Sequence, residues 1–390
     1  MKVTLKIHKY IVFLFFSSLF FENIDLFNLG IDFLATKITL VLLFISSLIN
    51  HKIFLNLVAF YKSLKWLFLY FIILTIISFL NVSRNFKDFL DIPFLLNIIL
   101  LVILICSESV IKGLLYKSLL VAAIVNFIIV LAYLNNYEVS YLDNRISLFG
   151  MNQNYLGVIS SVSLLVLISF IQNKNNNKFL RLLYLLFIPF IFYLIILTGS
   201  RTAMISLFLG VLVFFITSLD IEKVLIRLLF FMPLLAFILY VTLENTLILN
   251  RLFDTVEKGD LSSRDLIWID LLEVINNNFL FGIGKTGYLN VVGEGSPHNV
   301  IMEVICYTGI FGLFFFVLFL YRIINSGFKK INSSYNNIKL ILLLALIGLL
   351  LSGQWFDQKL VWSYIAYIIS ADFVLKKNNA VRKKVFTALR

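Results

Sequence analysis

The feature that most constrains this chain is the recurrence of apolar runs that are each long enough to cross a bilayer. About 20 consecutive apolar residues span the roughly 30 Å of hydrocarbon as an α-helix. A helix also satisfies its own backbone hydrogen bonds where no water is present. Twelve spans are predicted, near residues 8–22, 33–49, 64–80, 89–106, 114–134, 155–171, 180–198, 201–218, 224–243, 299–321, 337–353 and 360–375. We therefore expect residues 1–390 to form a single all-α membrane domain, a polytopic transmembrane helix bundle.

The composition excludes a set of soluble domains. Hydrophobic residues make up 61% of the chain and charged residues 14%, against roughly 25% charged in ordinary soluble domains. The net charge of +12 does not predict a nucleic-acid partner, because the basic residues lie in short connectors between apolar runs. The two cysteines, Cys106 and Cys306, lie inside apolar runs and predict neither a disulfide nor a metal site.

The distribution of basic residues predicts the orientation of the chain. With a cytoplasmic N-terminus and twelve spans, 23 Lys and Arg residues fall on the inside and 9 on the outside. This asymmetry follows the positive-inside rule, so both termini are expected in the cytoplasm. The basic start is followed by an apolar run at 11–21 without a small-residue cleavage site, which favours an uncleaved first span over a signal peptide.

One connector differs from the others in its length. Residues 244–298, between the ninth and tenth spans, form a long loop that is predicted to face outward. Within it, Ser262-Ser263-Arg264-Asp265 resembles a helix start, and residues 266–275 have apolar positions at helical spacing. We expect a short amphipathic helix lying along the membrane surface.

The glycine-rich segment Gly282-Ile283-Gly284-Lys285-Thr286-Gly287 imitates two nucleotide-binding motifs. It fits G-x-G-x-x-G, but no strand precedes it as a dinucleotide site requires. It also ends like a phosphate-binding loop, but the first glycine of that motif would fall on Phe279. The remaining interpretation is a flexible glycine turn that lets the backbone approach a ligand.

A histidine is predicted at the outer end of the tenth span. Ser296 and Pro297 suit a helix cap and first turn, which places His298 and Asn299 at a helix N-terminus. The helix dipole disfavours an imidazolium there, so a neutral His298 is able to accept a proton. The alternative is a polar interfacial anchor.

Arginines at the predicted outer surface indicate an anionic ligand. Arg201 lies in the tight turn between the seventh and eighth spans, and Arg264 begins the loop helix. Each guanidinium can bind phosphate oxygens through two hydrogen bonds, whereas an arginine at the hydrocarbon edge can also simply extend to the interface. Arg145 is a third outer cation, and Asn152 and Asn154 suit either sugar hydroxyls or helix capping.

Other polar and aromatic residues have simpler interpretations. Glu303, about one turn inside the tenth span, is expected to reach the outer interface rather than to be a buried charge. Gly309 and Gly312 favour close helix packing. Trp268, Trp355 and Trp362 fit an interfacial aromatic belt.

In this order, the motifs resemble the O-antigen ligase and O-antigen polymerase superfamily of bacterial membrane glycosyltransferases. The resemblance covers residues 145–315, and it lacks the proline common before the G-x-G turn, where Asn278-Phe279-Leu280-Phe281 stands instead. It implies that the catalytic residues are Arg201, Arg264 and His298. It implies substrate-binding roles for Arg145, Asn152, Asn154, Gly282, Gly284, Asn299 and Glu303.

The resemblance also implies the reaction and its place. The enzyme would sit in the inner membrane with its site facing the periplasm, and would need no cofactor and no metal. An undecaprenyl-diphosphate-linked oligosaccharide would be the donor, and a lipid A core or growing O-antigen or exopolysaccharide chain would be the acceptor. Arg201 and Arg264 would stabilise the leaving diphosphate, and His298 would deprotonate or orient the attacking hydroxyl, with inversion at the anomeric carbon. We expect these three side chains to converge in one pocket.

Three alternatives remain open. Ligase and polymerase signatures overlap, so the sequence does not separate them. A polysaccharide or small-solute transporter or flippase also suits twelve spans, although such proteins usually place ionisable or broken-helix sites near the midplane. A scaffold for other envelope enzymes is the third.

Overall fold

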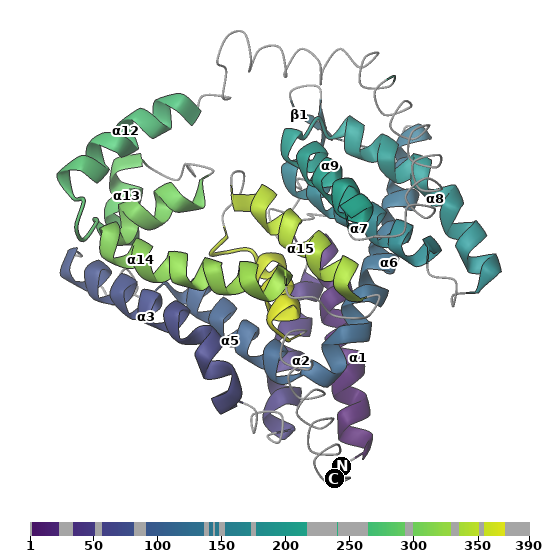
Figure 1. Cartoon of the computed structure of the whole chain (residues 1–390), viewed down its shortest axis with the longest axis horizontal. Helices are drawn as coiled ribbons and strands as arrows, with labels where there is room; N and C mark the ends of the chain where they lie inside the picture. The colour runs from purple at the N-terminus through teal and green to yellow at the C-terminus, as the bar shows by residue number, and fades with distance from the viewer. Residues whose placement is uncertain are drawn as a thin grey trace. The chain divides into compact units, whose positions relative to one another are not determined.

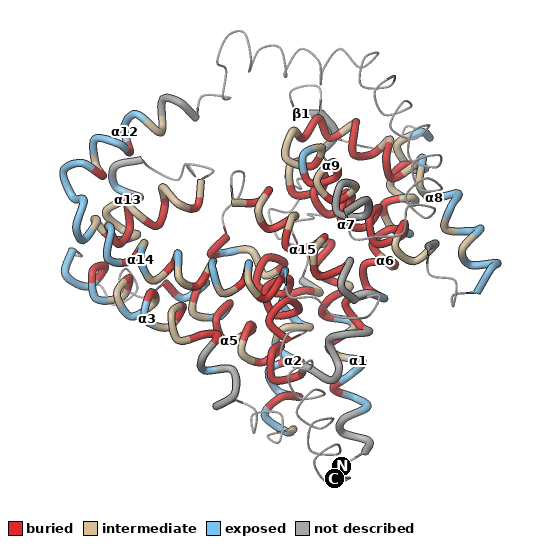
Figure 2. Tube along the Cα trace, viewed as in Figure 1, coloured by how far each residue is buried: buried red, intermediate tan, exposed pale blue. Residues whose placement is uncertain are grey.

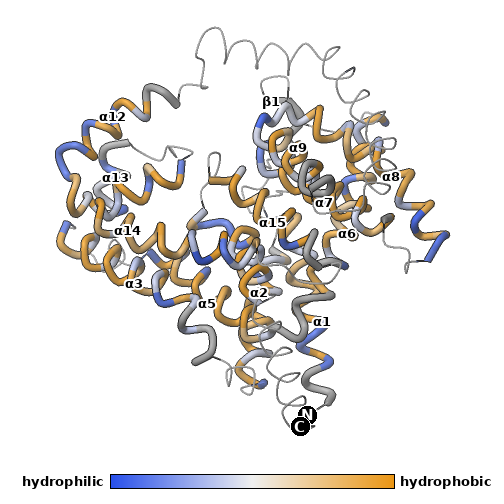
Figure 3. Tube along the Cα trace, in the orientation of Figure 1, coloured by the Kyte–Doolittle hydropathy of each residue, from blue (hydrophilic) through white to orange (hydrophobic). Residues whose placement is uncertain are grey.

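A computed structural model describes residues 2–22, 34–50, 57–81, 91–135, 140–142, 145–147, 153–172, 177–216, 240, 264–292, 299–328, 335–350 and 355–370. These ranges are helical except for one short hairpin and the turns between elements (Figure 1). Four helical segments are long and apolar enough to cross a membrane: Ser63–Asn81, Gln153–Ile171, Lys178–Leu197 and Val300–Phe328. Figure 3 shows the same helices as mostly hydrophobic along their length. The helical membrane class is therefore confirmed, whereas the number of spans and their orientation stay predictions.

The predicted spans and the observed helices agree closely. Eleven of the twelve coincide with helices in the described ranges, while the ninth, 224–243, lies outside them except for Tyr240. The helices are α1 (Lys2–Ser18) with the 3-10 turn η1 (Leu19–Phe21), α2 (Leu34–Ile49), α3 (Leu57–Asn81), α5 (Ile92–Cys106), α6 (Glu108–Leu134), α7 (Gln153–Gln172), α8 (Lys178–Leu197), α9 (Arg201–Ile216), α14 (Val300–Phe328), α15 (Tyr335–Leu350) and a final helix at 359–370. Apolar periodicity thus locates the helices within a few residues.

The chain divides into two compact units, and each is described by itself. The first contains residues 1–46, 112–259 and 331–348, and the second contains 47–111, 260–330 and 349–390. In the first unit, α7 packs against both α8 and α9 and is almost entirely buried (Figure 2). Gly157 allows the approach to α9, since a Cβ there would lie 2.8 Å from the Cβ of Ala203. The hydroxyl of Ser161 donates to the Ala203 carbonyl at 2.9 Å and secures the same contact.

The first unit also holds a small departure from the all-α prediction. Strand β1 (Ser140–Leu142) pairs antiparallel with β2 (Arg145–Ser147), with Leu142 opposite Arg145. The strand residues include Tyr141 and Ile146, and aromatic and β-branched side chains favour extended backbone. This hairpin precedes α7, so Arg145 lies on a strand and not in an irregular connector.

The second unit is built around an aromatic core. Helix α14 packs along α3, and the shorter helices α12 (Arg264–Asn277) and α13 (Gly284–Val292) pack against α14, with α13 also contacting α3. The Phe356 ring lies 4.9 Å from that of Phe94 and 6.0 Å from that of Tyr70. Trp355 and Trp362 are buried in this core. Their predicted place in an interfacial belt is therefore wrong, because the apolar rings are used to fill the protein interior.

Helix α14 is interrupted at Gly309. This residue has φ 59° and ψ −162°, which is not helical backbone. The amide of Ile310 donates to the Phe279 carbonyl at 2.9 Å, and the amide of Ile283 donates to the Cys306 carbonyl at 2.9 Å. The backbone of the segment that follows α12 therefore hydrogen-bonds to α14 at the break. Gly309 was predicted to allow close helix packing, but in the structure it interrupts the helix.

Candidate active site

Asn299, which the sequence placed at a helix N-terminus, lies at the start of α14. The side-chain oxygen of Asn299 accepts from the amides of Ile301 at 3.1 Å and Met302 at 3.4 Å. Asn299 is therefore the N-cap of α14, three residues later than the Ser296 cap that the sequence suggested. His298 directly precedes this cap in the chain and lies outside the described residues.

Glu303, on the first turn of α14, is a buried charge. Its exposed fraction is 3%, so the expectation that it reaches the outer interface is wrong. Its carboxylate acts electrostatically on Tyr288 and on Lys285, both on α13. Burial is the largest influence on Tyr288 and raises the pKa of its hydroxyl, and the Glu303 charge raises that pKa further. Glu303 thus contributes negative charge to the interior of the second unit, next to α13.

Arg201 occupies the tight turn that the sequence predicted. Helix α8 ends at Leu197, Gly199 has φ 56°, and α9 begins at Arg201 itself. The amide of Ala203 donates to the Ser200 hydroxyl at 3.3 Å, so Ser200 caps α9. Arg201 is half-buried in the first turn of that helix. A half-buried guanidinium at a helix N-terminus is a suitable anion-binding group.

The other predicted site residues are distributed over both units. Arg264 begins α12 in the second unit, as predicted, and the α12 side chains of Leu271 and Ile275 are buried. In the first unit, Arg145 begins β2 and Asn154 lies in the first turn of α7. Asn152 lies outside the described residues. The convergence of Arg201, Arg264 and His298 stays a prediction.

The two glycines of the G-x-G turn have positive φ angles, 69° at Gly282 and 71° at Gly284. A Cβ on Gly282 would lie 2.6 Å from the Cys306 carbonyl oxygen, and one on Gly284 would lie 3.0 Å from the Cα of Ser78. The turn therefore needs glycine because backbone meets backbone at these points. A further role in substrate binding stays a prediction.

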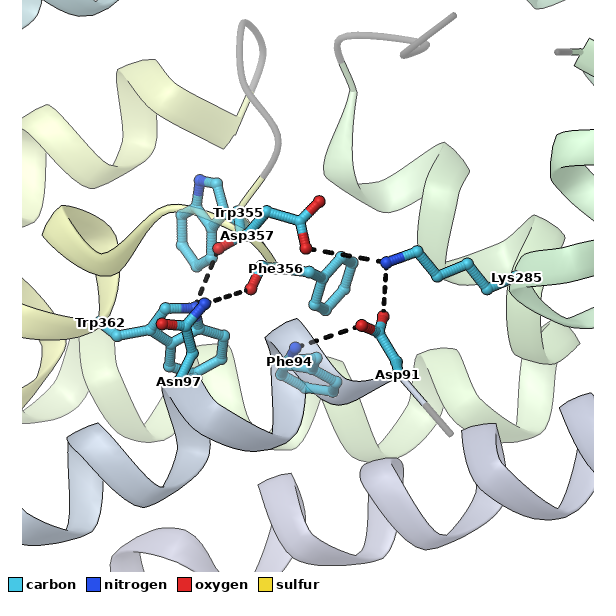
Figure 4. A network of polar contacts seen from close by, with 8 residues as sticks. All are labelled: Asp91, Phe94, Asn97, Lys285, Trp355, Phe356, Asp357 and Trp362. Carbon is cyan, nitrogen blue, oxygen red and sulfur yellow. Dashed lines mark hydrogen bonds and ion pairs between the residues drawn. The ribbon is translucent and has the colours of Figure 1, made fainter. Parts of the chain in front are cut away.

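The sequence analysis missed a cluster of charged side chains next to the turn at Gly282 and Gly284. Lys285, the second residue of α13, places its Nζ 2.8 Å from Asp91 Oδ2 and 3.7 Å from Asp357 Oδ1 (Figure 4). Asp91 is also the N-cap of α5, since its Oδ1 accepts from the Phe94 amide at 3.2 Å. One ammonium group thus connects three segments that are far apart in the sequence. We call Asp91, Lys285 and Asp357 the charge clamp.

The turn that carries Asp357 is held by two side chains that donate hydrogen bonds to the backbone carbonyls of the two residues before it. Asn97 donates from its Nδ2 to the Phe356 carbonyl at 2.6 Å, and the indole of Trp362 donates to the Trp355 carbonyl at 2.9 Å. Both donors are buried. The Asp357 carboxylate is therefore presented from a rigid turn.

Two groups of the clamp, Lys285 and Asp357, have shifted pKa values. Burial alone would lower the pKa of Lys285, but the Asp91 and Asp357 carboxylates outweigh it, so the pKa is raised and the ammonium stays charged. Burial is the largest influence on Asp357 and raises the pKa of its carboxyl; Lys285 lowers that pKa and Asp91 raises it, with a net increase. Asp357 therefore binds a proton more readily than an exposed aspartate does.

A signal for this cluster was present in the predicted topology. Asp91 begins the fourth span, Lys285 lies in the long loop, and Asp357 lies between the last two spans, so all three fall on the predicted outer side. Nothing in the sequence indicated that these charges pair. Within the described ranges, no group of three or more His, Cys, Asp or Glu side chains is arranged to hold a metal ion.

The apolar helices are those of a multi-pass helical membrane protein. Its charged and polar side chains include Lys285 and Asp91, which pair at the starts of α13 and α5. Residues 184–317 match the family model described as O-antigen ligase. This match supports membership of the chain in the O-antigen ligase/polymerase family, in agreement with the resemblance of its motifs. No curated protein matches the chain. The matched segment includes Arg201, Arg264, His298 and Lys285.

Proposed function

We propose that the protein transfers a glycan from an undecaprenyl-diphosphate carrier to an acceptor hydroxyl at the periplasmic face of the inner membrane. The observation that carries the proposal is the family match at 184–317, which contains Arg201, Arg264 and His298 in the order of the motifs. The acceptor is either a lipid A core or a growing polysaccharide chain, which corresponds to a ligase or a polymerase.

The proposed reaction is a direct displacement with inversion. The acceptor oxygen attacks the anomeric carbon and the bond from that carbon to the phosphate oxygen breaks, so the bonding electrons leave with the diphosphate. Arg201 and Arg264 stabilise the charge that develops on the diphosphate, in the role that a metal ion has in other transferases. His298 accepts the proton of the attacking hydroxyl.

The arrangement of the second unit supports a site on one side of the membrane. The start of α5 through Asp91 and the turn through Asp357 both meet Lys285 of α13, and α13 packs on α3 and α14. Gly284 lies against Ser78, near the end of α3. These are the ends that the twelve-span topology, with both termini cytoplasmic and the loop 244–298 outside, puts on the outer side. The gathering of these ends agrees with that topology.

The test uses the purified full chain in proteoliposomes, with the host's lipid-linked oligosaccharide as donor and its lipopolysaccharide core or repeat-unit oligosaccharide as acceptor. We expect transfer by the wild type, none by His298→Ala or Arg264→Ala, and partial transfer by Arg201→Lys, which keeps the charge but loses the two-pronged hydrogen bonding. Wild-type rates from His298→Ala would overturn the assignment. Translocation of the donor without transfer would identify a flippase instead.

A further inference from the structure

The three carboxylates whose charges act on Lys285 differ in what they can offer a ligand. Asp91 has a side-chain exposure of 4%, and its two oxygens are used by Lys285 and by the Phe94 amide. Glu303 is buried at 3% exposure. Asp357 has a side-chain exposure of 44% and lies 3.7 Å from the ammonium, and only one of its two oxygens is in contact with Lys285 (Figure 4). Asp357 is therefore the carboxylate of this cluster that an external ligand can reach.

Asp357 is also held more rigidly than its exposure suggests. The carbonyls of the two residues before it accept hydrogen bonds from Trp362 and Asn97. The amide of Val361 donates to the Gln358 carbonyl at 3.1 Å immediately after it. A half-exposed carboxylate on a fixed backbone loses little freedom when it binds a ligand, which is the property of a preorganised binding group.

The chemistry of the exposed carboxylate indicates the kind of ligand. Among the described residues, the charges that act on Asp357 and on its partner Lys285 include the carboxylates of Asp91 and Glu303 and the ammonium of Lys359. An ionised carboxylate is a strong acceptor for neutral hydroxyl donors. The chemistry fits the hydroxyl groups of a sugar.

We propose that Asp357 binds a hydroxyl group of the acceptor glycan, and that Lys285, itself held by Asp91, is a positioning residue that orients the Asp357 carboxylate. The inference rests on the proposed function and assigns the acceptor side of that site. Asp357 lies outside the segment that matches the family model, and the arginines that would bind the donor diphosphate lie inside it. The acceptor and donor would thus be bound by different residues.

A purely structural role for Asp357 explains less of the geometry. The buried, short contact between Lys285 and Asp91 is the part of the clamp that can stabilise the fold. At 3.7 Å and 44% side-chain exposure, the contact with Asp357 belongs to the class of exposed ion pairs that contribute little stability. A carboxylate whose removal costs little stability, but whose turn is fixed by two buried donors, is better explained by ligand binding.

The experiment compares Asp357→Asn, Lys285→Met and Lys285→Arg with the wild type in the same proteoliposomes. The matched control is Asp270→Asn, an exposed carboxylate on α12 of the same unit. Initial rates are measured while donor and acceptor are varied separately. Equilibrium binding of the acceptor oligosaccharide to the purified protein, without donor, is measured in parallel.

We expect Asp357→Asn to raise the KM for the acceptor and weaken acceptor binding about ten- to a hundred-fold, the loss of one hydrogen bond to a charged group. The KM for the donor should stay within about two-fold. Lys285→Met should shift the same acceptor parameters in the same direction, and Lys285→Arg should restore part of the loss, because the ammonium acts through Asp357.

Two outcomes would overturn the inference. One is wild-type acceptor KM and acceptor binding in Asp357→Asn, and the other is an equal rise in the donor KM. If the wild type transfers glycan and Asp357→Asn is normal, the inference fails and the proposed function stands. If the wild type binds the oligosaccharide no better than Asp357→Asn does and transfers none, both fail.

Discussion

Gly282 and Gly309 bring two stretches of backbone so close together that neither position can accept a side chain. A Cβ on Gly282 would lie 2.7 Å from the Gly309 amide nitrogen, and both residues have positive φ angles. The contact joins the turn after α12 to the break in α14. Because Lys285 follows Gly282 by three residues, the contact fixes the start of α13 relative to the break in α14, which lies ten residues after Asn299.

Replacement of Gly309 by alanine should destabilise the second unit by roughly 2–6 kcal/mol. The estimate combines roughly 1–3 kcal/mol for a backbone conformation that is essentially restricted to glycine with about 1–3 kcal/mol for overpacking. Gly282→Ala should act in the same way. The measurement is the free energy of unfolding in detergent. Leu280→Ala, in the same turn, removes a side chain that is 55% exposed and should cost much less. Equal losses from Gly309→Ala and Leu280→Ala would contradict the backbone contact.

The cap of α14 can be separated from any role of Asn299 in substrate binding. Asn299→Ala removes the acceptor for the Ile301 and Met302 amides and should cost about 1 kcal/mol of stability. Asn299→Ser keeps an oxygen for capping but removes the side-chain amide, so stability should return. If Asn299 also binds substrate, transfer by Asn299→Ser should stay low although the protein is stable. Full activity in a stable Asn299→Ser protein would limit Asn299 to its cap.

The contact of Lys285 with Asp91 should appear as a coupling energy. Lys285→Met leaves the Asp91 carboxylate buried without its ammonium, which should cost about 2 kcal/mol. Asp91→Asn keeps an oxygen for the Phe94 amide and should cost less. The double variant should lose less stability than the sum of the two single variants, since the second change removes the unpaired charge. Additive losses, measured by denaturant unfolding, would show that the two side chains do not interact.

The protonation of Asp357 predicts a dependence of stability on pH. Because its folded-state pKa is raised above the ordinary value of about 3.8, protonation favours the folded protein. This contribution is fully present below the ordinary pKa and is lost as the pH rises through the folded pKa. Asp357→Asn should therefore be at least as stable as the wild type near pH 7, and its advantage should disappear towards acid pH. Asp270→Asn controls for the loss of one carboxylate, and thermal unfolding at several pH values gives the comparison. An advantage that grows as the pH falls would contradict the sign of this shift.

The sequence predicted the helices well because the signal for each is local. A run of apolar residues is visible without knowledge of its neighbours, and the turn at Thr198 to Arg201 followed from the absence of any residues to form a loop. The cap of α14 was displaced to Asn299, because Ser296 and Asn299 are both good caps and only the tertiary position of the helix distinguishes them.

The charge clamp and the break in α14 could not be predicted, because both depend on contacts between distant segments. Gly309 looks like a packing glycine until the turn after α12 is placed against it. Lys285 stands in a decoy motif, and its partners Asp91 and Asp357 are 194 and 72 positions away. An aspartate before a proline-containing helix start predicts a cap, but not that the same carboxylate also binds a lysine.

The twelve-span topology predicts opposite sides of the membrane for two exposed residues that tolerate substitution. In a background in which Cys106 and Cys306 are replaced, we expect Asp270→Cys on α12 to react with a membrane-impermeant maleimide in intact spheroplasts. Lys178→Cys, at the start of α8, should react only after the membrane is permeabilised. The reason is that three predicted spans lie between these two positions. Because three is an odd number, the two positions must lie on opposite sides of the membrane. The background protein without cysteines controls for nonspecific labelling. Labelling of both positions in intact cells would reject the topology and, with it, the periplasmic placement of Arg264 and Lys285.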